Sequence, residues 1–248
     1  MLLQALGKCP AVEVHNESAD SAAFFGWKLR GDEVVRSLVV ASRNRLVAFK
    51  PLDDSHRVIH LMTGLGTPSQ GRAIWIYRQM EGRVRSTLAR WPAGDHRVFL
   101  QRIAEGREHW QSSGFSSDSL QLVRSFDYDD MTQESAEALR WHLRNLFFFE
   151  LGLAGRKDVA LVSYDRLVSD PETFLRMLCG FLGITFHPRM TAGIAARPRS
   201  TSSDLDIDNR IRVLCDDMQR RLDSELERRL ALFQQPSVSQ TSTMAAVG

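Results

Sequence analysis

Cysteines and long hydrophobic runs are both scarce in this sequence. Its 248 residues contain three cysteines, none of them in a Cys-x-x-Cys pair, at Cys9, Cys179 and Cys215. This number excludes a disulfide scaffold and argues against a structural zinc site. The longest apolar stretch, residues 73–77, ends at Arg78, whereas a span across a bilayer needs about 20 apolar residues. The chain therefore contains no predicted transmembrane segment.

The sequence also lacks a large excess of positive or negative charge. The formal net charge is +2, which is too balanced for a protein whose whole surface binds nucleic acid. With 43% hydrophobic and 25% charged residues, the composition is that of a globular protein. We expect one domain over residues 1–235 and a disordered Ser/Thr/Gln-rich tail over residues 236–248.

Lysine is rare among the basic residues. Only four of the 32 are lysines, so 28 are arginines. A guanidinium matches phosphate or sulfate oxygens two at a time, whereas an ammonium is a point charge. The codon bias of a high-GC genome explains the same ratio without any function. With either explanation, each of the four lysines is a candidate functional residue.

Hydrophobic periodicity predicts a parallel α/β unit near the middle of the chain. Residues 45–50 form a strand, 54–65 a helix and 73–78 a second strand, and such units are parallel and right-handed. The continuous apolar run at 73–78 is typical of a central strand covered on both faces. The other predicted elements are a helix at 1–8, a strand at 12–15, a helix at 32–42 capped by Asp32, helices at 80–91, 95–112 and 132–153, a strand at 158–164 and a helix at 171–182.

Two further segments complete the prediction. Residues 193–203 are rich in Ser, Pro and Arg and should form a loop. Residues 205–234 carry apolar side chains at spacings of three to four, which predicts an amphipathic helix packed on the domain. The fold class is therefore α/β with a mostly parallel sheet.

Polar side chains stand at the carboxyl ends of three predicted strands. These are Lys50, Arg78 and Tyr164. Open parallel sheets bind ligands beyond the carboxyl ends of their strands. The three side chains therefore predict a polar rim that suits an anionic nucleotide.

A set of phrases around these residues resembles the sulfotransferase family. Ile74-Trp-Ile-Tyr-Arg78, followed by Ser86 and then Arg90-Trp91, is similar to the 3′-phosphate-binding motif of that family. The segment from Val162 to Pro171, with Phe181-Leu-Gly183 after it, resembles the second landmark, a Tyr-Glu-Asp-Leu-x-x-Asp-Pro phrase. The resemblance runs from Met1 to about Leu230 and implies a three-layer, P-loop NTPase-like sandwich.

The resemblance implies a donor, a product and a role for each residue. The donor is 3′-phosphoadenosine 5′-phosphosulfate (PAPS), the product is adenosine 3′,5′-bisphosphate (PAP), and no metal is needed. Arg78 and Ser86 bind the 3′-phosphate, and Tyr164 reaches the adenosine. Lys50 stabilises the oxygen that bridges the sulfuryl group and the leaving phosphate.

The catalytic base implied by the resemblance is Glu17. In the carbohydrate and protein-tyrosine branch, a glutamate lies shortly after the helix that follows the phosphosulfate loop. Cytosolic small-molecule sulfotransferases instead use a histidine two residues after a lysine, a position occupied here by Leu52. His15 is the alternative base, and Arg197, Arg199 and Ser200 match the family's closing loop in composition only. The acceptor is open: carbohydrate, peptide tyrosine, lipid or small alcohol, through a hydroxyl or amine.

The front of the family pattern is missing. A strand and a Pro-x-Ser-Gly-Thr-Thr-like loop precede the first helix in the family, and the sequence contains neither. We expect either a truncated enzyme that has lost an inner strand, leaving neighbouring strand edges exposed, or a non-catalytic relative that serves as a nucleotide-binding or interaction module. Few unpaired cysteines favour the cytoplasm. A P-loop kinase would need Gly-x4-Gly-Lys-Ser/Thr, which does not occur.

Overall fold

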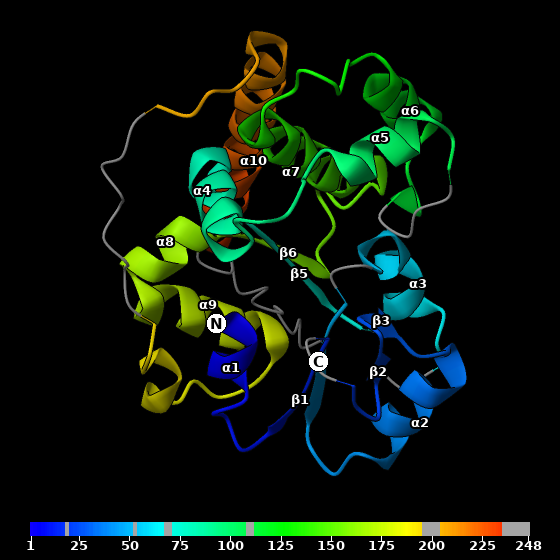
Figure 1. Ribbon diagram of the computed structural model, residues 1–248. Coiled ribbons are helices and arrows are strands. Elements are labelled where there is room, and N and C mark those ends of the chain that lie inside the picture. Colours follow the sequence, from blue (N-terminus) through cyan, green and yellow to red (C-terminus); the bar gives the residue numbers. More distant parts are fainter. Residues whose placement is uncertain (18–19, 52–53, 67–70, 108–111, 195–203, 235–248) are drawn as a thin grey trace, which may run out of the picture.

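The computed structural model describes residues 1–17, 20–51, 54–66, 71–107, 112–194 and 204–234 as a mixed α/β fold (Figure 1). The strands are β1 Val12–Asn16, β2 Phe24–Phe25, β3 Lys28–Leu29, β4 Leu46–Lys50, β5 Ala73–Tyr77 and β6 Val159–Ser163. The helices are α1 Leu2–Leu6, α2 Asp32–Ala41, α3 Val58–Thr63, α4 Met80–Arg90, α5 Val98–Ala104, α6 Ser117–Arg124, α7 Gln133–Glu150, α8 Tyr164–Ser169, α9 Pro171–Leu182 and α10 Asn209–Gln234. Two 3₁₀ turns, Ser55–Arg57 and Pro188–Thr191, are added to these.

The strands form small sheets that are mostly parallel. β1 pairs with β4 in parallel, from Val12 opposite Leu46 to Asn16 opposite Lys50. β5 pairs with β6 in the same sense, and β2 and β3 form an antiparallel hairpin. Among the described residues no ladder joins β4 to β5. The predicted strand-helix-strand unit therefore keeps its three elements, but each of its strands pairs with a different partner, which corrects the expected pairing.

The buried strand is β6 and not β5. All five residues of β6 are buried, because α10 packs against this strand. In β5 only Tyr77 is buried, and Ile76 is 40% exposed. The expectation of a central strand at 73–78 was therefore wrong, because in the described residues β5 has a paired strand on one edge only. Its two faces are partly covered, with Trp75 packed against one core and Ile74 against another.

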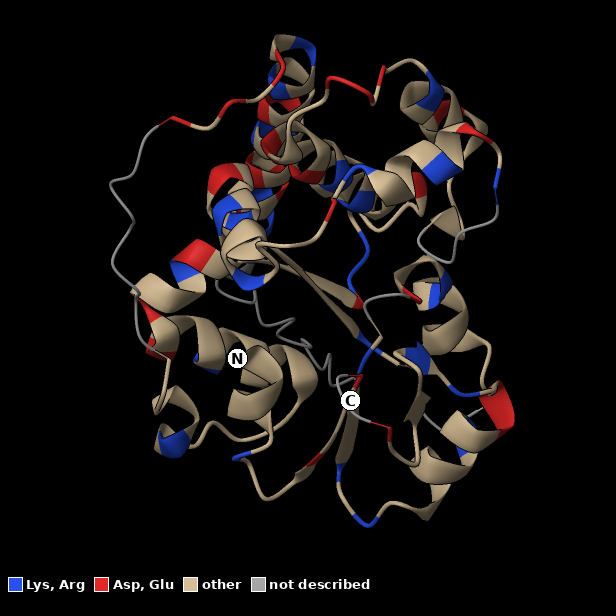
Figure 2. Ribbon diagram, viewed as in Figure 1, with Lys and Arg blue, Asp and Glu red and all other residues tan. Residues whose placement is uncertain are grey.

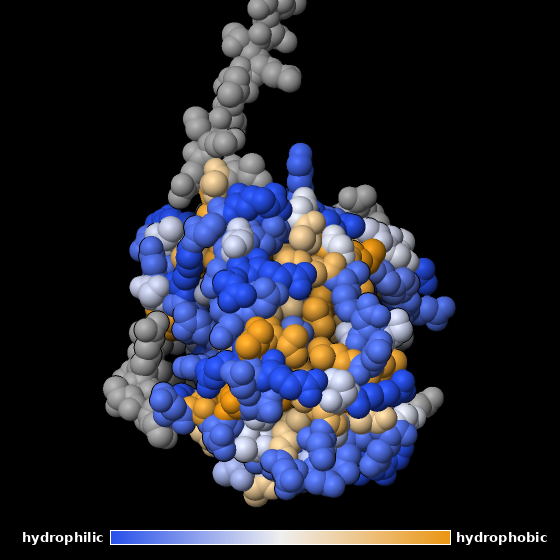
Figure 3. All heavy atoms as spheres, turned by 90° about the horizontal axis from the view of Figure 1, so that it is seen from above, coloured by the Kyte–Doolittle hydropathy of each residue, from blue (hydrophilic) through white to orange (hydrophobic). Residues whose placement is uncertain are grey.

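The largest core lies among α4, α7, α10 and the β5–β6 pair. α7 begins after Thr132, whose side chain accepts a hydrogen bond from the Ser135 backbone N–H as an N-cap. On α10, the core-facing side chains at spacings of three to four are fully buried: Ile211, Cys215, Met218, Leu222 and Leu226. This burial confirms that the amphipathic C-terminal helix packs on the domain. Seen from above, hydrophilic side chains surround a strip of apolar ones (Figure 3).

Two smaller cores support the rest of the molecule. α1 packs with α9 and the 188–191 turn through a cluster that includes Leu6, Leu178 and Met190. The β2–β3 hairpin, α2 and α3 enclose a third cluster around Phe24. Basic and acidic residues are interspersed along the helices (Figure 2), as the balanced net charge predicts.

Several element boundaries differ from the sequence-based expectation. Gly31 is the N-cap of α2, and Asp32 lies in the first turn. The predicted helix at 95–112 is the shorter α5, while the hairpin, α6 and α8 were not predicted. Most of the predicted loop at 193–203 and the predicted tail at 236–248 lie outside the described residues.

The three cysteines are free and buried, at Cys9, Cys179 and Cys215. Burial raises the pKa of the Cys215 thiol to about 12, so this thiol behaves as a packed side chain. No helix in the described part of the chain combines the length and apolarity that crossing a bilayer requires.

Candidate functional site

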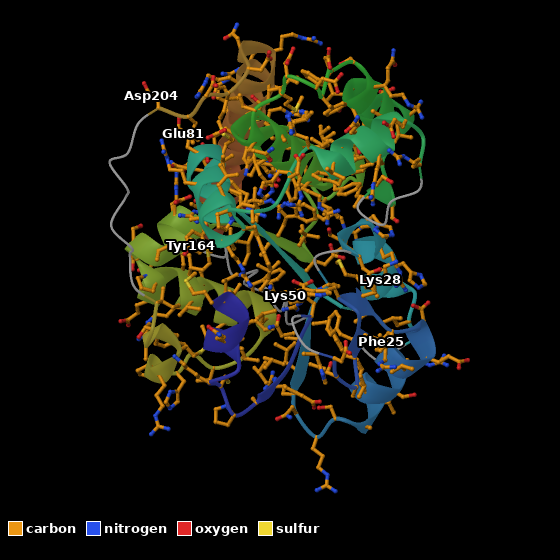
Figure 4. The ribbon with its side chains drawn as sticks, viewed as in Figure 1. Phe25, Lys28, Lys50, Glu81, Tyr164 and Asp204 are labelled. Carbon is orange, nitrogen blue, oxygen red and sulfur yellow. The ribbon has the colours of Figure 1, made fainter. Side chains whose placement is uncertain are left out.

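The three polar residues predicted at strand ends are found there. Lys50 is the last residue of β4, Arg78 directly follows β5, and Tyr164 follows β6 as the first residue of α8. In Figure 4 Tyr164 lies at the start of α8 and Lys50 in the middle of the molecule. Each side chain is thus carried by a strand end whose position is set by its ladder.

Arg78 is held by the first two residues of α8. Its guanidinium carbon lies 4.9 Å from the centroid of the Tyr164 ring, a distance typical of cation–π contacts. Its Nε is 4.0 Å from Oδ1 of Asp165, too far for a hydrogen bond. Nε is buried and has no hydrogen-bond partner. The guanidinium therefore keeps an unused donor although a carboxylate lies nearby.

The backbone on both sides of Arg78 is also fixed. Oδ2 of Asp165 accepts a hydrogen bond of 2.8 Å from the backbone N–H of Gln79, which is the N-cap of α4. Trp141 on α7 donates its indole N–H to the carbonyl of Arg78 at 2.9 Å. Such contacts restrict the positions that the Arg78 side chain can reach.

Ser86 is exposed on α4, one helical turn beyond Gly82. The Arg78 guanidinium lies over Gly82, and residues four apart share a helix face. Arg78 and Ser86 therefore border the same side of α4. Two hollows lie elsewhere: one of about 290 Å³ is lined by residues from α8, α9 and the end of α10, and one of about 180 Å³ by residues from α1 and 192–194. Neither hollow includes Arg78 or Ser86.

Arg83 on α4 lies among other arginines that act on its charge, Arg78 included, and the sequence pattern did not single it out. The pKa of Arg83 is lowered, mainly by burial. The positive charges of Arg140, Arg78 and Arg90 lower it further, against the opposing effect of Glu137. The positive charges around Arg83 favour an anion, and the carboxylates of Glu137 and Asp165 oppose this effect in part. The signal in the sequence was the arginine-rich stretch from 78 to 90 in a chain poor in lysine.

Glu17 and Lys50 lie side by side. The β1–β4 register places Asn16 opposite Lys50, and the Lys50 ammonium is 3.2 Å from Oε1 of Glu17. Glu17 is 4% exposed, whereas the Lys50 side chain is 42% exposed. The pKa of the Met1 amine is lowered by burial and by the charge of Lys50, so the start of α1 faces the same pair.

The five predicted residues thus fall into two groups and one single residue. Glu17 is joined to Lys50, Arg78 to Tyr164, and Ser86 lies apart on α4. His15, the alternative base, stacks on Phe49 with ring centroids 5.0 Å apart and pairs with Glu13. These contacts give His15 a structural role in the β1–β4 pair. The closing-loop candidates Arg197, Arg199 and Ser200 lie outside the described residues.

No group of three or more histidine, cysteine or acidic side chains that could hold a metal ion occurs within the described ranges.

Comparison with solved structures identifies the fold of this chain. No family model and no curated protein matches the sequence. The crystal structure of a sulfotransferase from Alicyclobacillus acidocaldarius is similar, with a TM-score of 0.51 and 14% identity, over 94% of this chain and 93% of that chain. The chain has a sulfotransferase fold.

Two other sulfotransferase structures show weaker similarity. The sulfotransferase domain from the Synechococcus PCC 7002 olefin synthase has a TM-score of 0.42 and 16% identity, over 83% of this chain and 64% of that one. The sulfotransferase domain from the curacin biosynthetic pathway has a TM-score of 0.43 and 16% identity, over 83% and 68%. The fold assignment rests on the first comparison.

Proposed function

We propose that this protein is a sulfotransferase that moves a sulfuryl group from PAPS to a hydroxyl or amine. The observation that carries the proposal is the Arg78 guanidinium, which keeps a buried, unpaired Nε at the carboxyl end of a parallel strand. The charge of Arg78 also acts on Arg83, which in turn lies near Arg90 and Arg140. A ribose 3′-phosphate is a dianion that such a cluster would bind.

The donor site combines Arg78, Ser86 and Tyr164. Arg78 binds the 3′-phosphate with its forked donors, and the Ser86 hydroxyl adds a hydrogen bond from the next turn of α4. Tyr164 contacts the adenosine end, and its ring also orients Arg78. The cation–π distance of 4.9 Å supports this second role. PAP, which keeps both phosphates, is the product that leaves this site.

The transfer itself uses Lys50 and Glu17. The acceptor oxygen or nitrogen attacks sulfur while the bond from sulfur to the bridging oxygen breaks. Lys50 stabilises the negative charge that grows on the departing phosphate. Glu17 takes the acceptor's proton, so a sulfated acceptor and PAP are formed. The 3.2 Å ion pair supports this assignment because it keeps the two groups adjacent.

A second candidate function is a non-catalytic nucleotide-binding or interaction module. The structure supports it by one feature: the Arg78–Tyr164 contact and the Glu17–Lys50 pair form separate groups, so nucleotide binding at Arg78 does not require the transfer residues. The sulfotransferase and a nucleotide-binding module both use Arg78, and they differ in whether the sulfuryl group is transferred.

Transfer of ³⁵S from labelled PAPS tests the proposal. The protein is incubated with a carbohydrate, a tyrosine peptide, a hydroxylated lipid and a small alcohol, each with unlabelled PAP as a competitor. We expect label in at least one acceptor and its loss as PAP rises. PAP binding without transfer to any of these acceptors would favour a nucleotide-binding module, and no PAP binding would refute the sulfotransferase and leave only an interaction module.

A further inference from the structure

A glycine in the first turn of α4 lies directly against the Arg78 guanidinium. Gly82 is the third residue of the helix, and it is not among the glycines with positive φ. Its backbone conformation is therefore open to any L-residue. Alanine is the better helix former, so the presence of glycine needs another reason.

The reason is the close approach of the Arg78 side chain to Gly82. A Cβ added there would lie 3.0 Å from Nε of Arg78 and 3.5 Å from both its Cζ and its Nη2. The optimal separation of such atoms is about 3.5–4.0 Å. The guanidinium thus packs against the backbone of Gly82, and a methyl group there would require its Nε to move by a few tenths of an ångström.

Displacing the guanidinium would change its other contacts. Its carbon is 4.9 Å from the Tyr164 ring centroid, and its Nε lies 4.0 Å from Asp165. Asp165 is itself fixed by the hydrogen bond from Gln79. A guanidinium shifted by a few tenths of an ångström would change its distances to the Tyr164 ring and the Asp165 carboxylate, and with them the direction of its donors.

We propose that Gly82 is a positioning residue for nucleotide recognition, because its missing side chain fixes where the Arg78 guanidinium lies. This inference rests on the proposed function in one respect, the nucleotide that Arg78 binds. The position of Arg78 itself can be measured without any nucleotide. Gly82 contacts no substrate in this role and acts only through Arg78.

The test is Gly82→Ala with Gly180→Ala as a matched control. Gly180 is a helical glycine of α9 with no atom within 4 Å of an added Cβ. Both substitutions should raise Tm or leave it unchanged, since alanine favours a helix. Only Gly82→Ala should weaken binding of PAP, by about 10-fold, which equals about 1.4 kcal/mol. A gain in stability with a loss in affinity is not expected from a purely structural glycine.

A second measurement follows Arg78 directly. The ¹⁵Nε–¹Hε NMR signal of Arg78, assigned by its loss in Arg78→Lys, should shift in Gly82→Ala and stay in place in Gly180→Ala. An unchanged signal in Gly82→Ala would overturn the inference, whatever the affinity. Equal PAP affinity of Gly82→Ala and the wild type would also overturn it. If the wild type bound no PAP, the proposed function would fail, and the nucleotide role of Gly82 with it.

Discussion

At the scale of single residues, the buried carboxylate of Glu17 carries the most specific catalytic claim. Substitution Glu17→Gln keeps a polar group near Lys50 but removes the acceptor for a proton. We expect sulfuryl transfer to fall by about 10²–10⁴-fold, the range for loss of a general base. PAP affinity should change little, because Glu17 is joined to Lys50 and not to Arg78.

The control for Glu17 is Glu13→Gln on β1, the strand that ends directly before Glu17. Glu13 pairs with His15 and accepts from Ser42, away from the Lys50 ammonium. Its substitution should leave transfer close to the wild-type rate in a ³⁵S assay. Full turnover by Glu17→Gln would remove Glu17 from the mechanism.

The sequence could predict single residues where a strand end carries them. Lys50, Arg78 and Tyr164 stand at the expected strand ends, and the neighbourhood of Glu17 and Lys50 follows from the β1–β4 register. The sequence could not show the Arg83–Glu137–Arg140 group, because α4 and α7 meet only through tertiary packing. The stacking of Tyr164 on Arg78 also depends on how β5 and β6 pair.

At the scale of elements, Arg229 of α10 fastens this helix to the loop before β6. Its side chain is 7% exposed and donates to the carbonyls of Leu153, Arg156 and Val159. It also pairs with Glu225 at 2.7 Å. Arg229→Met would leave these groups buried without their donor. We expect the free energy of unfolding to fall by about 3–5 kcal/mol, measured by urea denaturation.

Arg228→Met is the matched control for Arg229. Arg228 pairs with the same carboxylate, but its side chain is 51% exposed. An exposed pair of this kind contributes about 0–1 kcal/mol. Equal losses for the two variants would contradict the view that burial decides the effect.

The contact between α7 and α10 should also make stability depend on pH. His142 is buried, and its Nδ1 lies 3.1 Å from the Leu214 carbonyl. Burial lowers its pKa from 6.5, more than the hydrogen bond to Leu214 raises it. Below about pH 6.5 the unfolded chain therefore binds more protons than the folded one, and stability falls as pH falls.

The measurement is urea unfolding at several pH values for the wild type and His142→Gln, which keeps a donor for Leu214. Between about pH 5 and 6.5 the wild type should lose up to about 1.4 kcal/mol per pH unit more than the variant. Parallel curves would show that His142 does not titrate in this way.

Elements were predictable where the periodicity was long and regular. α7, α9 and α10 fall close to the expected ranges, and Pro171 at the start of α9 is a strong start signal. The hairpin at 24–29 was not predicted, because each of its strands has only two residues. Its Gly26-Trp27 turn has positive φ at both positions. Positive φ at a tryptophan is uncommon, so the residues of this turn do not form a pattern that predicts a hairpin.

At the scale of the whole molecule, the α/β class and the parallel strands were predicted, whereas the division of the strands into separate pairs was not. Parallel pairing depends on contacts far apart in sequence, such as Ala73 with Val159, which local patterns do not encode. The similarity to the Alicyclobacillus acidocaldarius sulfotransferase extends over 94% of the chain. The fold therefore supports the resemblance that the phrases around Arg78 and Tyr164 indicated, and the site assignment depends on nucleotide recognition.

The central claim is that Arg78 recognises a ribose 3′-phosphate. Calorimetric titration compares PAP with adenosine 5′-monophosphate, on the wild type, Arg78→Ala and Arg220→Ala, whose side chain is 70% exposed on α10. We predict that the wild type and Arg220→Ala prefer PAP, and that Arg78→Ala loses about 10- to 150-fold in PAP affinity, the range for hydrogen bonds to charged groups. Equal affinity of the wild type for the two nucleotides, or an unchanged PAP affinity in Arg78→Ala, would contradict the account.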